Sequence, residues 1–308
     1  MASTTVLTNV DAYLEDSRLP SDAGYIPPLL LQPQYGFVPQ RFNPGFPEIR
    51  DVSEKRPSQN GTFDFTRYFG ARAITLEVAL ASELQDDPLV TDQVLEDQLR
   101  RWMAPDVRAY LYIRYDSADE YRRIKIRPSN LGSQLSFLHH RDFRKVSLGW
   151  RGVDGIFESA VIQSEFLEVA GSTELGRTYD QLYDKTYTAS LVIGAKNLTN
   201  FGNIEVLPVI RIYGPCTQPR IENQTTGIKL EFLASYSIAS GDYITIDFAE
   251  GTVLLNGDPS NSRYDKIDFA SGISKWWTLI PGVNSIRFYP LSSSPPSKAI
   301  LEWRSGYL

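Results

Sequence analysis

Cysteine, histidine and methionine are nearly missing from this sequence of 308 residues. It holds one cysteine, Cys216, and two histidines, His139 and His140. A single cysteine cannot form an internal disulfide, and three Cys and His side chains are one fewer than a structural zinc site of that type requires. We therefore expect no metal, no cofactor and no disulfide framework in this protein.

Long apolar runs and an excess of positive charge are also lacking. No run approaches the roughly 18 apolar residues of a membrane span, and residues 1–16 lack the basic and apolar regions of a secretory signal. The formal net charge is −6, from 31 Lys and Arg against 37 Asp and Glu. An acidic chain is a poor general nucleic-acid binder. The composition, 42% hydrophobic and 12% aromatic, is that of a folded globular protein.

Motifs that would carry enzyme chemistry are absent too. No two glycines are spaced i, i+2, so a dinucleotide-binding fingerprint is excluded, and neither Gly-x-Ser-x-Gly nor His-Glu-x-x-His occurs. Residues 171–178 have the glycine spacing of a phosphate loop, but Arg177 stands where that loop needs lysine, so we interpret them as an interdomain loop. Cys216 is interpreted as a small apolar filler and His139 and His140 as a loop pair. The sequence favours a protein that is not an enzyme.

Residues 1–61 are rich in proline and aromatic residues. Eight of the 19 prolines fall in this stretch, together with Tyr35, Phe37, Phe42 and Phe46. Proline fixes φ and removes a backbone donor, so neither a helix nor a central strand is expected, whereas disordered linkers are usually poor in aromatics. We predict an extended arm whose rings pack on a surface. That surface belongs either to the arm's own domain or to a neighbouring subunit.

The middle of the chain, residues 62–180, predicts an α+β domain. Alternating apolar residues over 74–80 indicate a strand, and a helix is expected to begin at Thr91 and to end before Pro105. Residues 109–115 and 121–127 read as the two strands of a hairpin. These patterns predict an antiparallel sheet with one main helix packed on it.

The last part of the chain, residues 181–308, predicts strands only. Period-two alternation recurs at regular spacing between turn signals, with Asn256-Gly257 as a strong tight-turn signal. Short strands without a helical stretch indicate a β-sandwich or jelly roll. We place the domain boundary in the polar stretch near Asp180.

Two further groups of residues are candidate contact sites. Arg123, Lys125 and Arg127 project to one side of a predicted strand, either as a solvated face or as a contact with an acidic partner or a passing polymer. Trp276 and Trp277 are adjacent. Paired tryptophans can stack on sugars, but neighbours on a strand face opposite ways, which favours a core role for one of them.

The carboxy-terminal third carries an ordered series of motifs. It runs from Pro208–Gly214 through Pro219–Asn223, Gly241–Asp247 and Trp277–Asn284 to Leu301–Arg304. This series resembles the carboxy-terminal domain of the distal tail proteins (Dit), or minor tail proteins, of long-tailed siphovirus phages. The middle of the chain is similar to the amino-terminal belt domain of the same family.

The resemblance implies a structural role in the virion, at the distal end of the phage tail. Members form a hexameric ring through their belt domains and carry a galectin-like sandwich that projects outward. The implied partners are other copies of the chain, the tail tube protein, the tail-tip hub or tail-associated protein, and the tape measure protein. Two other hypotheses stay open: a host-surface carbohydrate binder that uses Trp276 or Trp277, and a cell-wall hydrolase.

Overall fold

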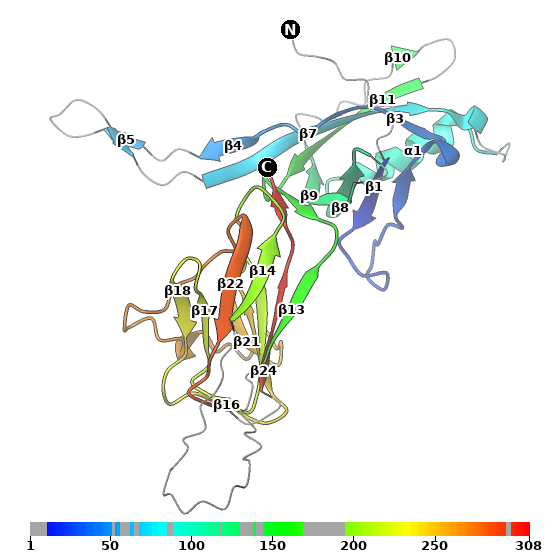
Figure 1. Cartoon of the computed structure of the whole chain (residues 1–308). Coiled ribbons are helices and arrows are strands. Elements are labelled where there is room, and N and C mark those ends of the chain that lie inside the picture. The colour runs from blue at the N-terminus through cyan, green and yellow to red at the C-terminus, as the bar shows by residue number, and fades with distance from the viewer. Residues whose placement is uncertain are drawn as a thin grey trace, which may run out of the picture. The chain divides into compact units, whose positions relative to one another are not determined.

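The structure of the chain is a computed structural model that is mostly β, with one α-helix among the residues it describes (Figure 1). It describes residues 11–50, 53–55, 62–64, 68–84, 89–116, 119–129, 138–139, 144–168, 195–293 and 297–308. Contacts divide the chain into two compact units. The first consists of Met1–Val161 with Tyr307–Leu308, and the second is Ile162–Gly306.

The first unit is built on one curled sheet of 11 strands, in the central order β2-β1-β8-β9-β11-β7-β3. These strands are β1 (Asp11–Asp16), β2 (Leu29–Leu31), β3 (Phe37–Asn43), β7 (Tyr68–Leu80), β8 (Ala109–Arg114), β9 (Arg122–Pro128) and β11 (Arg144–Gly152). The strands that extend it are β4 (Pro47–Arg50), β10 (Leu138–His139), β12 (Phe157–Ser159) and β25 (Gly306–Tyr307), while β5 (Ser53–Lys55) and β6 (Thr62–Asp64) pair with each other. Alternate residues of the main strands are buried, so one face of the sheet encloses the core and the other faces out.

Helix α1 (Asp92–Trp102) closes the core of the first unit. It begins where the sequence predicts, because the Thr91 side chain accepts a hydrogen bond from the Val94 N–H, 3.4 Å away. Leu95, Leu99 and Trp102 are all at most 3% exposed and pack into the core. Short 3-10 turns at Pro33–Tyr35 and Ser82–Leu84 flank the same region. No helix in the described ranges combines the length and hydropathy needed for a bilayer crossing.

The second unit has two main sheets around one hydrophobic core. One sheet has the order β13-β24-β15-β20-β21 and the other β14-β22-β17-β18. Their bounds are β13 (Gln163–Glu168), β14 (Ala195–Asn200), β15 (Val209–Tyr213), β17 (Arg220–Asn223), β18 (Ile228–Glu231), β20 (Tyr243–Asp247), β21 (Thr252–Leu255), β22 (Gly282–Phe288) and β24 (Lys298–Trp303). A small third sheet joins β16 (Cys216–Thr217), β19 (Ser237–Ile238) and β23 (Ser292–Ser293), and a 3-10 turn spans Tyr264–Lys266.

The predicted arm differs from what the structure shows. Within residues 1–61, β1 is a central strand between β2 and β8, and β3 pairs with β7. The prolines allow this because β1 contains none, and because Pro39 in β3 sits where the register shifts, on the outer strand of the order. The described part of the arm therefore packs on its own chain. By contacts, the chain divides between Val161 and Ile162, whereas the sequence predicts a boundary near Asp180, which lies outside the described residues.

Candidate functional site

Strands β4 and β7 form a two-stranded ribbon that extends beyond the rest of the first unit's sheet (Figure 1). Strand β11 pairs with β7 only as far as Arg72, which lies opposite Gly152. Beyond that point Phe69 lies opposite Ile49, and Tyr68 opposite Arg50. A two-stranded ribbon is marginally stable in water when no further element covers it.

The ribbon exposes large apolar side chains, which we call the ribbon patch. The exposed fractions are 86% for Phe46, 62% for Ile49, 64% for Tyr68 and 45% for Phe69. Ile49 and Phe69 are register partners and share one face of the ribbon, whereas Tyr68 points to the other face. Scattered exposed apolar residues are ordinary, but four on one short projection make the ribbon a candidate contact surface. Sequence reasoning found Phe46 and missed the other three, because their exposure depends on where β11 stops.

The aromatic residues predicted for the arm fall into two groups. Phe37 and Phe42 are 1% and 8% exposed and belong to the core of the first unit, where Phe42 also lies 6.4 Å from the ring of Phe157. Tyr35 is 43% exposed and Phe46 is 86% exposed. Of these four residues, only Tyr35 and Phe46 therefore present a free ring to a partner.

The predicted basic residues occupy the outer face of β9, with Ile124 and Ile126 buried between them, as expected. Arg123 is engaged within the chain: its guanidinium lies 3.2 Å from the Glu158 carboxylate and 4.4 Å from the Tyr110 ring centroid. Burial by itself would lower the pKa of Arg123, but hydrogen bonding to Tyr112 and the charge of Glu158 raise it. Lys125 is half-buried and Arg127 exposed, and within the described residues neither has an ion-pair partner.

A tyrosine cluster lies next to Arg123, and sequence reasoning missed it. Tyr13 of β1 stacks on Tyr112 of β8 with ring centroids 4.3 Å apart and planes 6° apart, and the Tyr121 ring meets Tyr13 at 71° with centroids 5.3 Å apart. Burial raises the pKa of Tyr13 well above its ordinary value. The alternation in residues 11–16 indicates a strand, but nothing in the sequence shows that this strand pairs with residues 109–114.

The paired tryptophans of the second unit differ in exposure. Trp277 is 2% exposed and packs 4.8 Å from Phe248, so its ring has no surface for a ligand. Trp276 is half-buried and stacks at 27° against Tyr264, which is 44% exposed. Neither tryptophan lies in a strand, but Trp277 points inward, as predicted for one of the two.

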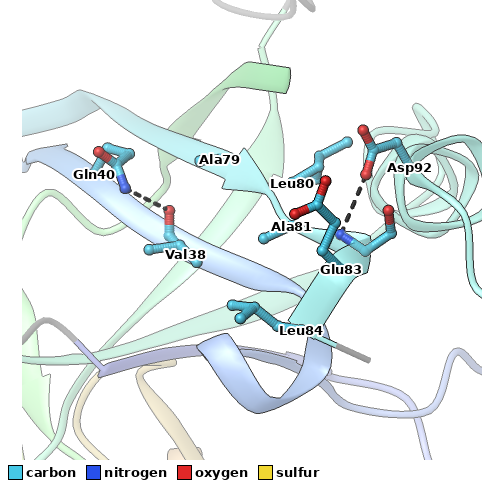
Figure 2. A pocket seen from close by; sticks show the side chains of 9 residues that line it. Val38, Gln40, Ala79, Leu80, Ala81, Glu83, Leu84 and Asp92 are labelled. Atoms are coloured by element: carbon cyan, nitrogen blue, oxygen red, sulfur yellow. Dashed lines mark hydrogen bonds between the residues drawn. The ribbon is translucent and has the colours of Figure 1, made fainter. Parts of the chain in front are cut away.

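A pocket of about 330 Å³ lies where β3, β7 and α1 meet, and Figure 2 shows its lining. Val38 and Gln40 of β3 line one side, and Glu83 and Asp92 lie together at the other end. The Asp92 carboxylate accepts a hydrogen bond from the Ser82 N–H at 3.3 Å. The pocket combines apolar walls with two carboxylates.

Side chains that could hold a metal ion are not gathered in the part of the chain that the structure describes. No cluster of three or more Cys, His, Asp and Glu side chains occurs there. Cys216 is buried, and burial raises its pKa to about 11, so the thiol is protonated at neutral pH. Residues 171–178 and His140 lie outside the described residues, and of the His139 side chain nothing is described.

Comparisons with known proteins point to phage tails. Residues 201–307 match the family described as siphovirus-type tail component, C-terminal domain. The fold is similar to the crystal structure of the Dit protein of phage SPP1, with a TM-score of 0.59 and 13% identity over 96% of this chain and 99% of that one. A baseplate chain of phage P2, in its calcium-activated conformation, aligns over 96% of this chain and 98% of its own, with a TM-score of 0.39 and 10% identity. No curated protein matches the sequence.

The matched region, 201–307, contains the motif series on which the sequence resemblance rests. The fold likeness extends over nearly the whole chain, including the first unit. Residues 201–307 are therefore similar to the siphovirus-type tail component C-terminal domain, and the chain has a fold similar to that of the SPP1 Dit protein.

Proposed function

We propose that this protein is a structural ring component at the distal end of a phage tail and has no enzymatic activity. Six copies close a ring through the first unit, which serves as the belt domain. The ring joins the tail tube protein to the tail-tip hub, with the tape measure protein as a further neighbour. The SPP1 Dit protein is described as a paradigm of the hub adsorption apparatus in phages that infect Gram-positive bacteria, which supports a hub role for this chain.

The ribbon patch carries this proposal. Phe46, Ile49, Tyr68 and Phe69 are exposed on a ribbon that no third strand joins within the described residues, which is an unfavourable state for an isolated protomer in water. Covering such a surface with a neighbouring copy removes apolar area from water and gives the ribbon the packing that it lacks. Tyr and Phe are also enriched at protein interfaces.

Negative-stain electron microscopy of the purified chain tests the proposal, with and without tail tube protein. We expect closed rings of six subunits under at least one of these conditions. A chain that stays monomeric at every concentration, even with tail tube protein present, would contradict the ring. Turnover of any substrate by the pure chain would contradict the non-enzymatic role.

A second candidate function rests on the aromatic cluster of the second unit, which we propose has a galectin-like form. The Tyr264 ring is 44% exposed and stacks on Trp276, with Phe269 tilted against Trp276, an arrangement suited to the apolar face of a sugar. A glycan array decides this role: binding that Trp276→Ala abolishes and Phe201→Ala preserves would support a carbohydrate binder. An array without signal would eliminate it.

A further inference from the structure

The outer face of β9 and β11 carries positive charges that have no ion-pair partner among the described residues. Arg127 and Arg151 are direct register partners on adjacent strands, and both are exposed. Side chains directly opposite each other in an antiparallel pair have Cβ atoms roughly 5 Å apart, and like charges there are destabilising. Lys125 precedes them on the same face. Among the described residues none of the three has an ion-pair partner. We call these three residues the basic face.

The opposite charge is gathered at another part of the same unit. Residues 81–99 contain six acidic residues and no lysine or arginine. Within this segment Glu83 and Asp97 are exposed and Asp92 is half-buried, and we call these three the acidic edge. Glu83 and Asp92 border the 330 Å³ pocket, whose apolar walls include Val38 and Leu84 (Figure 2).

The basic face and the acidic edge are too far apart to neutralise each other in one protomer. Arg151 is the register partner of Ala73 on β7, whereas the pocket is lined by Ala79 on the same strand. Six residues of a strand span roughly 20 Å. That distance is about twice the Debye length of roughly 8–10 Å at physiological salt, so the attraction within one chain is largely screened.

We propose that the basic face of one protomer contacts the acidic edge of the next copy of this chain. The 330 Å³ pocket there takes a basic side chain, its methylene stem lying along Val38 and Leu84 and its cationic head reaching Glu83 and Asp92. Charge complementarity selects a second copy as the occupant. A contact that joins two different surfaces is heterologous, and a heterologous contact repeats around a ring when the rotation closes. The inference rests on the proposed ring and names the surfaces that meet in it.

Two charge-reversed variants of the full chain test this contact. The face variant carries Arg127→Glu and Arg151→Glu, and the edge variant carries Glu83→Lys and Asp97→Lys. All four residues are exposed, so melting temperatures should change little. Each variant has like charges on both surfaces, and we expect at least a 30-fold rise in the protomer concentration at half-assembly. Lys266→Glu with Lys275→Glu, in the second unit, is the matched control and should assemble like the wild type.

Mixing the two variants gives the decisive result. The acidic surfaces of the face variant then meet the basic surfaces of the edge variant, so the equimolar mixture should assemble into rings in which they alternate. Raising NaCl from 0.05 to 0.5 M should weaken this assembly, because the contact is electrostatic. Rings formed equally well by each variant alone, or no recovery on mixing, would overturn the contact. If the wild type forms no rings but the two variants bind each other, the ring proposal fails while the contact stands.

Discussion

Replacing Phe46 by serine should weaken assembly without destabilising the protomer. The Phe46 ring is 86% exposed, so within the isolated chain it contributes little to the core. An aromatic side chain buries about 150–250 Å² when fully covered, of which roughly 130–210 Å² remains available at this exposure. At about 25 cal/mol per Å² the covered ring contributes roughly 3–5 kcal/mol per interface, an upper bound because coverage is incomplete.

Half of that bound corresponds to roughly a 10- to 100-fold rise in the protomer concentration at half-assembly. Analytical ultracentrifugation over a dilution series measures this concentration, and thermal unfolding of the dilute protomer should show an unchanged midpoint. Phe201→Ser is the matched control, because Phe201 is 69% exposed in the second unit, outside the ribbon patch. Equal assembly of Phe46→Ser and the wild type would refute the assignment of the ribbon patch to the interface.

Three further predictions concern stability. Arg72 is 3% exposed, and its Nε and Nη2 have no hydrogen-bond partner among the residues that the structure describes. Arg72→Met should therefore raise the free energy of unfolding by about 1 kcal/mol in urea titration, and a decrease would contradict this. Because the pKa of Cys216 rises from 9.0 to about 11 on folding, the thiol favours the folded state below pH 9 and loses that advantage between pH 9 and 11. Between pH 9 and 11, under reducing conditions, the free energy of unfolding of the wild type should therefore fall by about 2–3 kcal/mol more than that of Cys216→Ala. Parallel curves of unfolding free energy against pH would contradict the shift. Thr91→Ala removes the helix cap and should lower the free energy of unfolding by about 1 kcal/mol in urea titration. An unchanged midpoint would show that the cap does not stabilise the protein.

Local patterns in the sequence predicted local structure well. The helix follows from the Thr91 cap and the stop before Pro105, and the inward Ile124 and Ile126 follow from simple alternation. The all-β character of the second unit follows from the same alternation, since each strand buries every other residue. These features depend on residues a few positions apart.

Features that join distant segments could not be predicted. Strand β1 pairs with β8 about 100 residues later, and no spacing rule links residue 13 to residue 112. The proline content of residues 1–61 argued against a helix or a central strand there, yet β1, which is free of proline, is central, and β3 contains Pro39 at a register shift. The juxtaposition of Arg127 and Arg151 likewise depends on the register of β9 against β11.

The central claim is that this chain closes a ring with copies of itself. Native mass spectrometry of the purified chain, alone and with tail tube protein, tests it most directly. A six-membered ring has six times the protomer mass of 34.8 kDa, about 209 kDa. A dominant species at that mass is the predicted result, and a single species at 34.8 kDa under every condition would contradict the account.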